Sequence, residues 1–315
     1  EATATTDDTG AKTPDPAGFR CEVLERGETG DVDNAELVET SGLAASQLHD
    51  GVVWATNDSG QRSGVFALGS AGQDLGFFVL TDAGGEVTTL DVEDLAIADD
   101  VLYLADIGDN GARRDTVVVH AVAEPTPSTV GTDGTATVLG TIEFQYPDGP
   151  TDAEAVLVDP VAGELVILSK DLDDPSAPTQ LYTVPLAAID GPVVPATEAG
   201  TVDVTALTTS SDGFSFNTLL FPGSVTGADL SPAGDLIAIR TYGSVWLFPR
   251  GPGQSVTEAL TGNEPCEAGS AAEAQGESVA FLPGPAEGEA GTVSYVTISE
   301  GANPPVNLST VVVSG

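Results

Sequence analysis

Glutamate recurs at one position of a short phrase that the sequence repeats, and this recurrence could build a metal site. Each phrase combines small or acidic residues with an aliphatic one, at 41–44, 93–96, 154–157, 228–231 and 277–280. In a closed repeating fold such residues converge on one axis, where carboxylates repel one another unless they bind protons or a cation. Several hard oxygen atoms in one place suit calcium. The predicted metal ligands are Ser41, Glu93, Asp94, Glu154, Asp229 and Glu277.

A second group of polar residues follows the strand after each phrase and should face the same mouth. Its candidate ligand-binding members are Asn57, Asp58, Asp106, Asp109 and Asn110. Five of the nine basic residues also fall there, namely Arg62, Arg113, Arg114, Lys170 and Arg240. Gathered beside a metal, they would bind a small anion such as a phosphate or carboxylate, with Tyr242 as a further contact. Two alternatives stay open: the acids belong to a generally acidic surface, and each base neutralises a neighbouring Asp.

Two functional classes fit these residues. In a metal-dependent hydrolase of phosphate or other esters, calcium would polarise the anion and activate water, with Glu93 or Glu154 as the general base. In an extracellular binding module, lectin-like or adhesion-like, calcium would be structural. A Ser nucleophile with a His base has little support, because the chain has two His residues and no Gly-x-Ser-x-Gly elbow.

Net charge and composition exclude other classes of function. The chain has 49 acidic and 9 basic residues, a formal net charge of −40, which excludes a nucleic-acid-binding protein. No apolar run approaches the ~20 residues of a membrane span, so we expect no membrane insertion. Acidic excess with scarce Lys favours a halotolerant protein over an ordinary acidic exoprotein. We expect a monomer that binds a small anionic molecule or another extracellular ligand.

The first residues and the cysteine count predict export. The chain begins Glu1-Ala2-Thr3 and contains no Met, which we interpret as the mature terminus of a secreted, extracellular protein. Two cysteines in an exported chain suggest one disulfide, between Cys21 and Cys266. Two buried free thiols are the alternative.

Short apolar runs between Gly, Asp and Pro turns predict an all-β domain over 19–315, after a flexible leader at 1–18. Second strands follow the phrases at 52–56, 101–105, 165–169, 236–240 and 293–298, and third strands at 64–68, 117–122, 180–184, 244–248 and 308–313. Fourth strands follow in four units, at 75–80, 138–144, 202–207 and 256–260.

The last unit lacks a fourth strand, whereas the strand at 19–25 has no unit of its own. The repeat therefore predicts a five-bladed β-propeller whose last blade is closed by the N-terminal strand. A β-sandwich stays open as an alternative, and so do six blades, because 212–223 is a long insertion.

Four strings in the first two units resemble known propellers: ETSGLA at 39–44, WATNDSG at 54–60, VEDLA at 92–96 and YLADIGDN at 103–110. They look like the SdiA-regulated (YjiK-like) five-bladed family and the esterase-like-phytase propellers, which are secreted bacterial proteins, and more loosely like the calcium-activated nucleotidases. The nucleotidases hold an axial calcium through Glu, Ser and Asp. The resemblance implies that such a metal faces Ser41, Glu93, Glu154, Asp229 and Glu277. The fourth phrase departs from the pattern, with Ala228 where Glu is expected.

Overall fold

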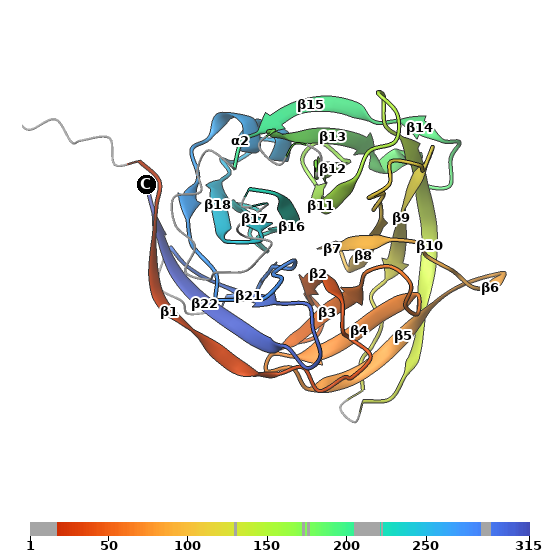
Figure 1. The fold of residues 1–315 in the computed structure, drawn as a ribbon, viewed down its shortest axis with the longest axis horizontal. Helices are drawn as coiled ribbons and strands as arrows, with labels where there is room; N and C mark the ends of the chain where they lie inside the picture. Colours follow the sequence, from red (N-terminus) through yellow and green to blue (C-terminus); the bar gives the residue numbers. More distant parts are fainter. Residues whose placement is uncertain are drawn as a thin grey trace, which may run out of the picture.

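The structure, a computed structural model, describes residues 18–128, 131–171, 174, 177–204, 221, 223–284 and 291–315. The predicted leader lies outside the described residues apart from Gly18, and so does most of the connection at 212–223. The described chain is an all-β propeller, in which groups of antiparallel strands stand around a central axis with their first strands innermost (Figure 1). The first two groups are joined into one sheet by parallel pairing of their outer strands. This confirms the predicted fold class.

The strands form successive four-stranded antiparallel groups. The first contains β2 (Thr40–Ala45), β3 (Val52–Asn57), β4 (Gly64–Gly69) and β5 (Asp74–Asp82). The second contains β7 (Val92–Ala98), β8 (Val101–Asp106), β9 (Val117–Ala123) and β10 (Gly134–Gln145). The third contains β11 (Ala153–Asp159), β12 (Glu164–Ser169), β13 (Thr179–Pro185) and β15 (Thr197–Val202).

The fourth group contains β16 (Val225–Leu230), β17 (Leu236–Thr241), β18 (Val245–Pro249) and β19 (Cys266–Glu267). The last contains β20 (Ala280–Phe281), β21 (Thr292–Ile298), β22 (Pro305–Ser314) and β1 (Arg20–Asp31). Minor elements are β6 (Gly85–Glu86), β14 (Val194–Pro195) and the 3-10 turn η1 (Leu186–Ala188). The number of blades stays a prediction, because residues 205–220 are not described.

The prediction of a strand at 256–260 is wrong, because this segment lies in helix α2 (Val256–Gly262). Ser255 and Glu258 form a reciprocal capping box that starts the helix. Val256, Ala259 and Leu260 have helical spacing and are buried against the neighbouring group. The outer strand of the fourth group is instead the short β19, and β15 ends at the residue where its predicted strand begins.

The N-terminal strand closes the ring, as predicted. β1 pairs antiparallel with β22 from Arg20 opposite Ser314 to Asp31 opposite Pro305, and the two lie side by side in Figure 1. Cys21 in β1 is bonded to Cys266 in β19, which confirms the predicted disulfide and links the closing strand to the fourth group. For a separation of 245 residues, the chain-entropy model assigns the bond about 5 kcal/mol of stabilisation. No described helix is long and apolar enough to cross a membrane.

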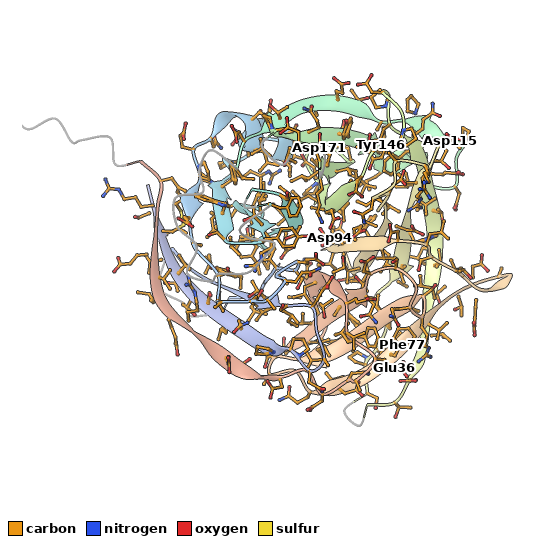
Figure 2. All side chains as sticks on the ribbon, viewed as in Figure 1. Glu36, Phe77, Asp94, Asp115, Tyr146 and Asp171 are labelled. Carbon is orange, nitrogen blue, oxygen red and sulfur yellow. A yellow bond between two sulfur atoms is a disulfide. The ribbon has the colours of Figure 1, made fainter. Side chains whose placement is uncertain are left out.

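Asp94 ties the innermost strands together at the axis, where Figure 2 labels it. Its carboxylate accepts hydrogen bonds from the backbone N–H groups of Leu95 (2.8 Å), Val156 (2.9 Å) and Ala228 (3.3 Å), which belong to β7, β11 and β16. Asp229 similarly accepts a backbone N–H of β20 at 2.7 Å. These bonds fix the spacing of the inner strands, and with it the spacing of the side chains at the channel mouth.

Candidate metal centre

A β-bulge at the same place in successive inner strands presents one residue per strand at the channel mouth. Strand pairing shifts register within β2, β7, β11 and β16, and an isolated bridge from Gly276 to Ser299 gives the matching position in the last group. The equivalent inner residues are Ser41, Glu93, Glu154, Thr226 and Glu277. The equivalent residues just after the paired ends of the second strands are Asp58, Ile107, Lys170, Tyr242 and Glu300.

This register corrects the predicted alignment of the fourth phrase. Thr226, rather than Ala228 or Asp229, is the counterpart of Glu93 and Glu154. The phrase matches the others by composition, but it lies two residues further along its strand. The fourth group therefore contributes a hydroxyl to this position, and the Thr226 hydroxyl donates to the backbone carbonyl of Gly276 at 3.0 Å.

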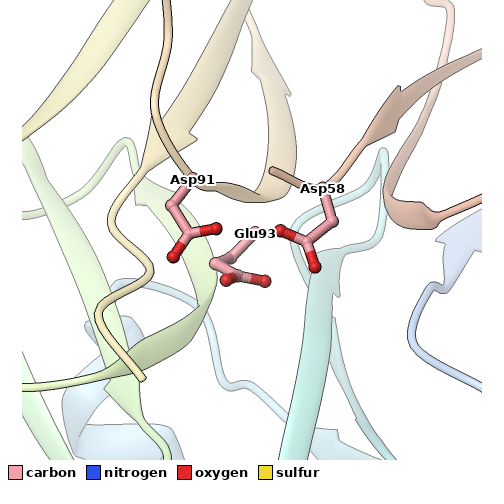
Figure 3. Close-up of side chains that lie close together, drawn as sticks. All are labelled: Asp58, Asp91 and Glu93. Atoms are coloured by element: carbon pink, nitrogen blue, oxygen red, sulfur yellow. The ribbon is translucent and has the colours of Figure 1, made fainter. Parts of the chain in front are cut away.

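Two overlapping carboxylate triads lie at the mouth. One contains Asp58, Asp91 and Glu93, which point toward one another in Figure 3, and the other contains Glu93, Asp152 and Glu154. Within each triad the chosen oxygen atoms all lie within 4.8 Å of one another. We call Asp58, Asp91, Glu93 and Asp152 the carboxylate half of the mouth.

Two oxygen atoms of the carboxylate half are buried without a partner. Among the described residues, Glu93 Oε1 and Asp152 Oδ2 have no hydrogen-bond donor. Glu93 is only 2 % exposed to solvent. Gly108 lies beneath the acids, since a Cβ there would be 2.1 Å from Glu93 Oε1 and 2.6 Å from Asp91 Oδ2. Buried polar atoms without partners are costly, so these oxygens fit a bound cation. Carboxylate oxygens without Cys or His suit calcium rather than zinc.

The electrostatics of the carboxylate half show the cost of leaving it without a cation. Burial and the nearby Asp58 raise the pKa of Asp91 to about 7. Burial, followed by the charge of Glu154, raises the pKa of Glu93 well above its ordinary value, and burial also raises the pKa of Asp152. A divalent cation among these groups would favour their ionised forms.

The opposite side of the mouth carries its own cation. Lys170 Nζ donates to Glu154 Oε1 at 2.7 Å, and it lies 5.1 Å from the centre of the Tyr242 ring. The Tyr242 hydroxyl donates to Glu277 Oε1 at 3.2 Å. We call Glu154, Lys170, Tyr242, Glu277 and Glu300 the lysine half. Glu154 joins the halves, because it also belongs to the second triad.

In the lysine half, charge and protons are balanced internally. Burial lowers the pKa of Lys170, but the surrounding Glu154, Tyr242 and Glu277 together raise it well above its ordinary value, so the ammonium stays charged. Burial raises the pKa of Glu154 to about 7 despite Lys170. Burial and the hydrogen bond with Glu300 raise the pKa of Glu277 to about 8, so this pair of carboxyls retains a proton near neutrality.

Three predicted metal ligands have other contacts in the described structure. The Ser41 hydroxyl donates to the backbone carbonyl of Glu93 and lies 3.4 Å from Glu93 Oε2. Asp94 and Asp229 accept backbone N–H groups at the axis and belong to neither triad. Burial raises the pKa of Asp94 well above its ordinary value and that of Asp229 to about 8. Asp94 and Asp229 therefore link neighbouring inner strands through hydrogen bonds.

Sequence analysis missed Asp91 and Asp152, although the signal was present. Both begin an Asp-x-Glu string, Asp91-Val-Glu93 and Asp152-Ala-Glu154, at the same place in two successive units. The repeated string therefore marks the two strand entries that supply most of the carboxylates. The repeated phrases begin at the Glu and so do not include the Asp two positions earlier.

The predicted basic residues do not gather into one cluster in the described structure. Arg62 pairs with the exposed Glu36 at 2.9 Å, Arg114 pairs with Asp106 at 2.8 Å, and Arg240 pairs with Glu273 at 2.8 Å in full burial. Arg113 is exposed. Arg62, Arg114 and Arg240 therefore pair with acidic residues, but only Arg114 pairs with a nearby Asp, as the salt-bridge alternative expected. Only Lys170 among the five lines the channel cavity.

The remaining predicted residues shape the loops of the mouth. Asn57 Oδ1 accepts the backbone N–H groups of Val38 and Glu39 at 3.1 and 3.0 Å. Asp109 Oδ2 accepts those of Arg113 and Arg114, both at 2.7 Å. These bonds hold the segment that enters β2 and the loop after β8 in place.

Two cavities open beside these side chains. The channel cavity, about 240 Å³, is lined by Asp58, Glu93, Glu154, Lys170, Tyr242 and Glu300, among others. A side cavity of about 330 Å³ lies between the second and third groups. Asn110 and Lys170 line both cavities, so a ligand in the side cavity would lie next to the triads.

Comparisons with known proteins leave the family open. No family model matches the chain, and no curated protein matches it. Solved structures that it resembles include the nidogen/laminin complex, with 12 % identity over 84 % of this chain and 77 % of that one at a TM-score of 0.41. Another is an iodide structure of the Trichoderma reesei carbohydrate-active enzyme of family AA12, with 12 % identity, 93 % and 96 % coverage and a TM-score of 0.44. At these values neither likeness bears on function.

Proposed function

We propose that this chain is an extracellular β-propeller that binds one hard divalent cation, calcium, in the carboxylate half of its channel mouth. The observation that carries the proposal is the pair of buried, unpartnered oxygens, Glu93 Oε1 and Asp152 Oδ2, within overlapping carboxylate triads. Asp58, Asp91, Glu93 and Asp152 would hold the ion. The Cys21–Cys266 disulfide supports an oxidising location such as the outside of the cell.

We further propose that the site hydrolyses an ester or phosphate ester. Bound calcium would polarise the ester oxygen and lower the pKa of water. Glu93 is better placed than Glu154 to accept a proton, because Glu154 Oε1 is already held by Lys170 at 2.7 Å. Lys170 lines both cavities and would orient the ligand through its ammonium group.

A binding module with structural calcium is the second candidate, and one observation favours it. The arginines expected to bind an anion are engaged elsewhere or lie apart, so the described cavities offer Lys170 alone for charge recognition. A panel of nucleotides, phytate, lactones and aryl esters, assayed with calcium and with EDTA, separates the candidates. Calcium-dependent turnover of any of them supports the hydrolase, and calcium binding without turnover supports the module.

Calorimetric titration with calcium tests the metal site itself. We expect Glu93→Gln to weaken calcium binding by more than tenfold and Asp152→Asn to weaken it as well, because each removes a buried anionic oxygen. Glu22→Gln, which removes an exposed carboxylate on β1, is the matched control and should bind as the unmodified chain does. If the unmodified chain binds no calcium, or if Glu93→Gln binds it equally well, the proposal is wrong.

A further inference from the structure

The side cavity lies next to the triads and has a different character from them. It is bordered by the loop after β8, by the loop that enters β11, by the end of β12 and by the start of β13. Asp152 is common to both regions: it belongs to the second triad and also lines the side cavity. A ligand seated there would therefore have one end within reach of the proposed metal.

The charges that line the side cavity disfavour a highly charged ligand. Its described lining has one basic residue, Lys170, against Asp109, Asp152 and Asp171, so a polyanion would meet net negative charge. A cationic ligand would meet the Lys170 ammonium. All three acids already accept backbone N–H groups. Asp109 Oδ2 accepts two, Asp152 Oδ1 accepts that of Asp109 at 2.8 Å, and Asp171 Oδ1 accepts that of Asp174 at 3.0 Å.

The available polar atoms include both donors and acceptors. Ser169 Oγ accepts the backbone N–H of Gln180 at 3.0 Å, which leaves its own hydrogen free to donate. The side-chain amides of Gln180 and Asn110 can each donate and accept at the edge of the cavity. Hydroxyl groups, which also donate and accept, are the ligand groups that match such a wall.

The volume of the side cavity and the apolar side chains in its wall limit the size of the ligand further. The Tyr182 ring packs edge to face against Tyr146, with centroids 4.9 Å apart, so it is held in one orientation. Pro150 and Pro178 add apolar surface at the rim. A volume of about 330 Å³ lies at the low end of small-molecule sites, which span about 300–1,000 Å³. It therefore suits a ligand of about one ring rather than a long chain.

We propose that the side cavity binds a neutral, hydroxyl-rich ring, a cyclic polyol or pyranose, whose one end faces the metal site. This assignment rests on the proposed function, because the metal site gives the cavity its role as the place where the uncharged part of the ligand is held. It replaces the small anion expected from the sequence with a ligand whose recognition is by hydroxyl groups.

Calorimetry or saturation-transfer NMR on the full chain tests the assignment. The probes are methyl glucoside, methyl galactoside, methyl mannoside and myo-inositol as neutral polyols, with glucuronate, inositol hexakisphosphate and glucosamine as charged counterparts, each with calcium and with EDTA. We expect at least one neutral polyol to bind and to bind more tightly than the charged probes. Gln180→Ala and Ser169→Ala should each weaken that binding at least fivefold. Gln145→Ala, an exposed strand glutamine at the end of β10, is the control and should leave it unchanged.

The outcomes separate this assignment from the proposed function. Calcium binding without binding of any neutral polyol overturns the polyol assignment and leaves the metal site standing. Polyol binding that Gln180→Ala and Ser169→Ala weaken, in a chain that binds no calcium, supports the cavity and overturns the metal site. Tighter binding of a charged probe, or neutral binding that neither variant changes, overturns the assignment.

Discussion

The carboxylate half and the lysine half of the channel mouth start from the same local geometry. Glu93 and Glu154 occupy equivalent bulges of neighbouring inner strands, and both are almost fully buried. Their surroundings differ at the residue just after the second strand of their own group, which is Ile107 for Glu93 and Lys170 for Glu154. Where Lys170 follows, the chain supplies its own cation. Where Ile107 follows, the chain supplies no charge, and the carboxylate half keeps two oxygens without partners.

The comparison shows that one position of a repeat can decide whether buried acids are neutralised internally or by an outside ion. An ion pair within the chain fixes Glu154 at the expense of its availability as a ligand. The carboxylate half stays less stable alone but gains a binding function, because a cation that binds only the folded protein stabilises it.

Removal of the internal cation should have the largest effect. Lys170→Met leaves Glu154 buried without its positive partner, so we expect the free energy of unfolding at pH 7 in EDTA to fall by about 3–5 kcal/mol. Guanidinium unfolding measures this. The double variant with Glu154→Gln should recover much of the loss, since the unpaired charge is then absent. A loss below about 1 kcal/mol, with no recovery in the double variant, would show that the two halves are not neutralised differently.

The next largest effect should be the dependence of the free energy of unfolding on pH. In EDTA the folded-state pKa values of Asp91 and Glu154 are about 7 and that of Glu277 about 8, all above their ordinary values near 4. Groups with raised pKa stabilise the fold fully below the unfolded value, and this stabilisation is lost as pH rises through the folded value. We therefore expect the free energy of unfolding to fall by a few kcal/mol from pH 5 to pH 9.

Saturating calcium should remove part of this fall, because the ion stabilises the ionised carboxylate half and leaves the lysine half unchanged. Denaturant unfolding at several pH values, in EDTA and in calcium, measures both curves. In Glu93→Gln the two curves should nearly coincide. A free energy that stays flat from pH 5 to pH 9 in EDTA would contradict the raised pKa values.

The fold could be predicted from the sequence because a propeller repeats a short, strongly patterned unit. The alternation of apolar runs and turns predicted the order of the strands. The last unit lacked a strand and the first strand had no unit, which predicted the closure by β1 that its pairing with β22 confirms. The helix α2 was missed because Val256 to Leu260 is also a plausible strand when only apolar content is considered. The capping pair Ser255 and Glu258 was the overlooked signal.

The candidate site could be predicted only in part. Glu93, Glu154 and Glu277 were placed at one repeat position, and the strand register puts them there. The register of the fourth phrase depends on a bulge, which similarity of composition cannot locate. Adjacent residues also diverge, because Glu93 lies at the mouth whereas Asp94 accepts three backbone N–H groups at the axis. Which of two neighbouring acids accepts backbone hydrogen bonds depends on how the strands pack, and the sequence alone does not reveal it.

A smaller change should affect the carboxylate half alone. Gly108→Ala places a methyl group 2.1 Å from the present position of Glu93 Oε1, so the acids must move apart. We expect calcium affinity to fall about tenfold by calorimetry, while Lys170 and its partners are unaffected. Gly111→Ala, in the same loop, is the control, since its methyl would meet only the flexible Arg113 side chain, at 3.1 Å. Equal affinities in the two variants would show that these carboxylates do not hold the ion.

The smallest expected effect separates the acidic surface from the buried acids. With a formal net charge of −40, sodium chloride should raise the melting temperature by a few degrees up to about molar concentration, because it screens repulsion between exposed carboxylates. Sodium chloride should stabilise the carboxylate half only slightly, because the oxygens of this half are largely buried and dissolved ions cannot screen them. At matched ionic strength, calcium chloride should therefore raise the melting temperature further than sodium chloride. In Glu93→Gln this excess should vanish while the sodium chloride slope remains, and a loss of both together would mean that calcium acts on the surface charge alone.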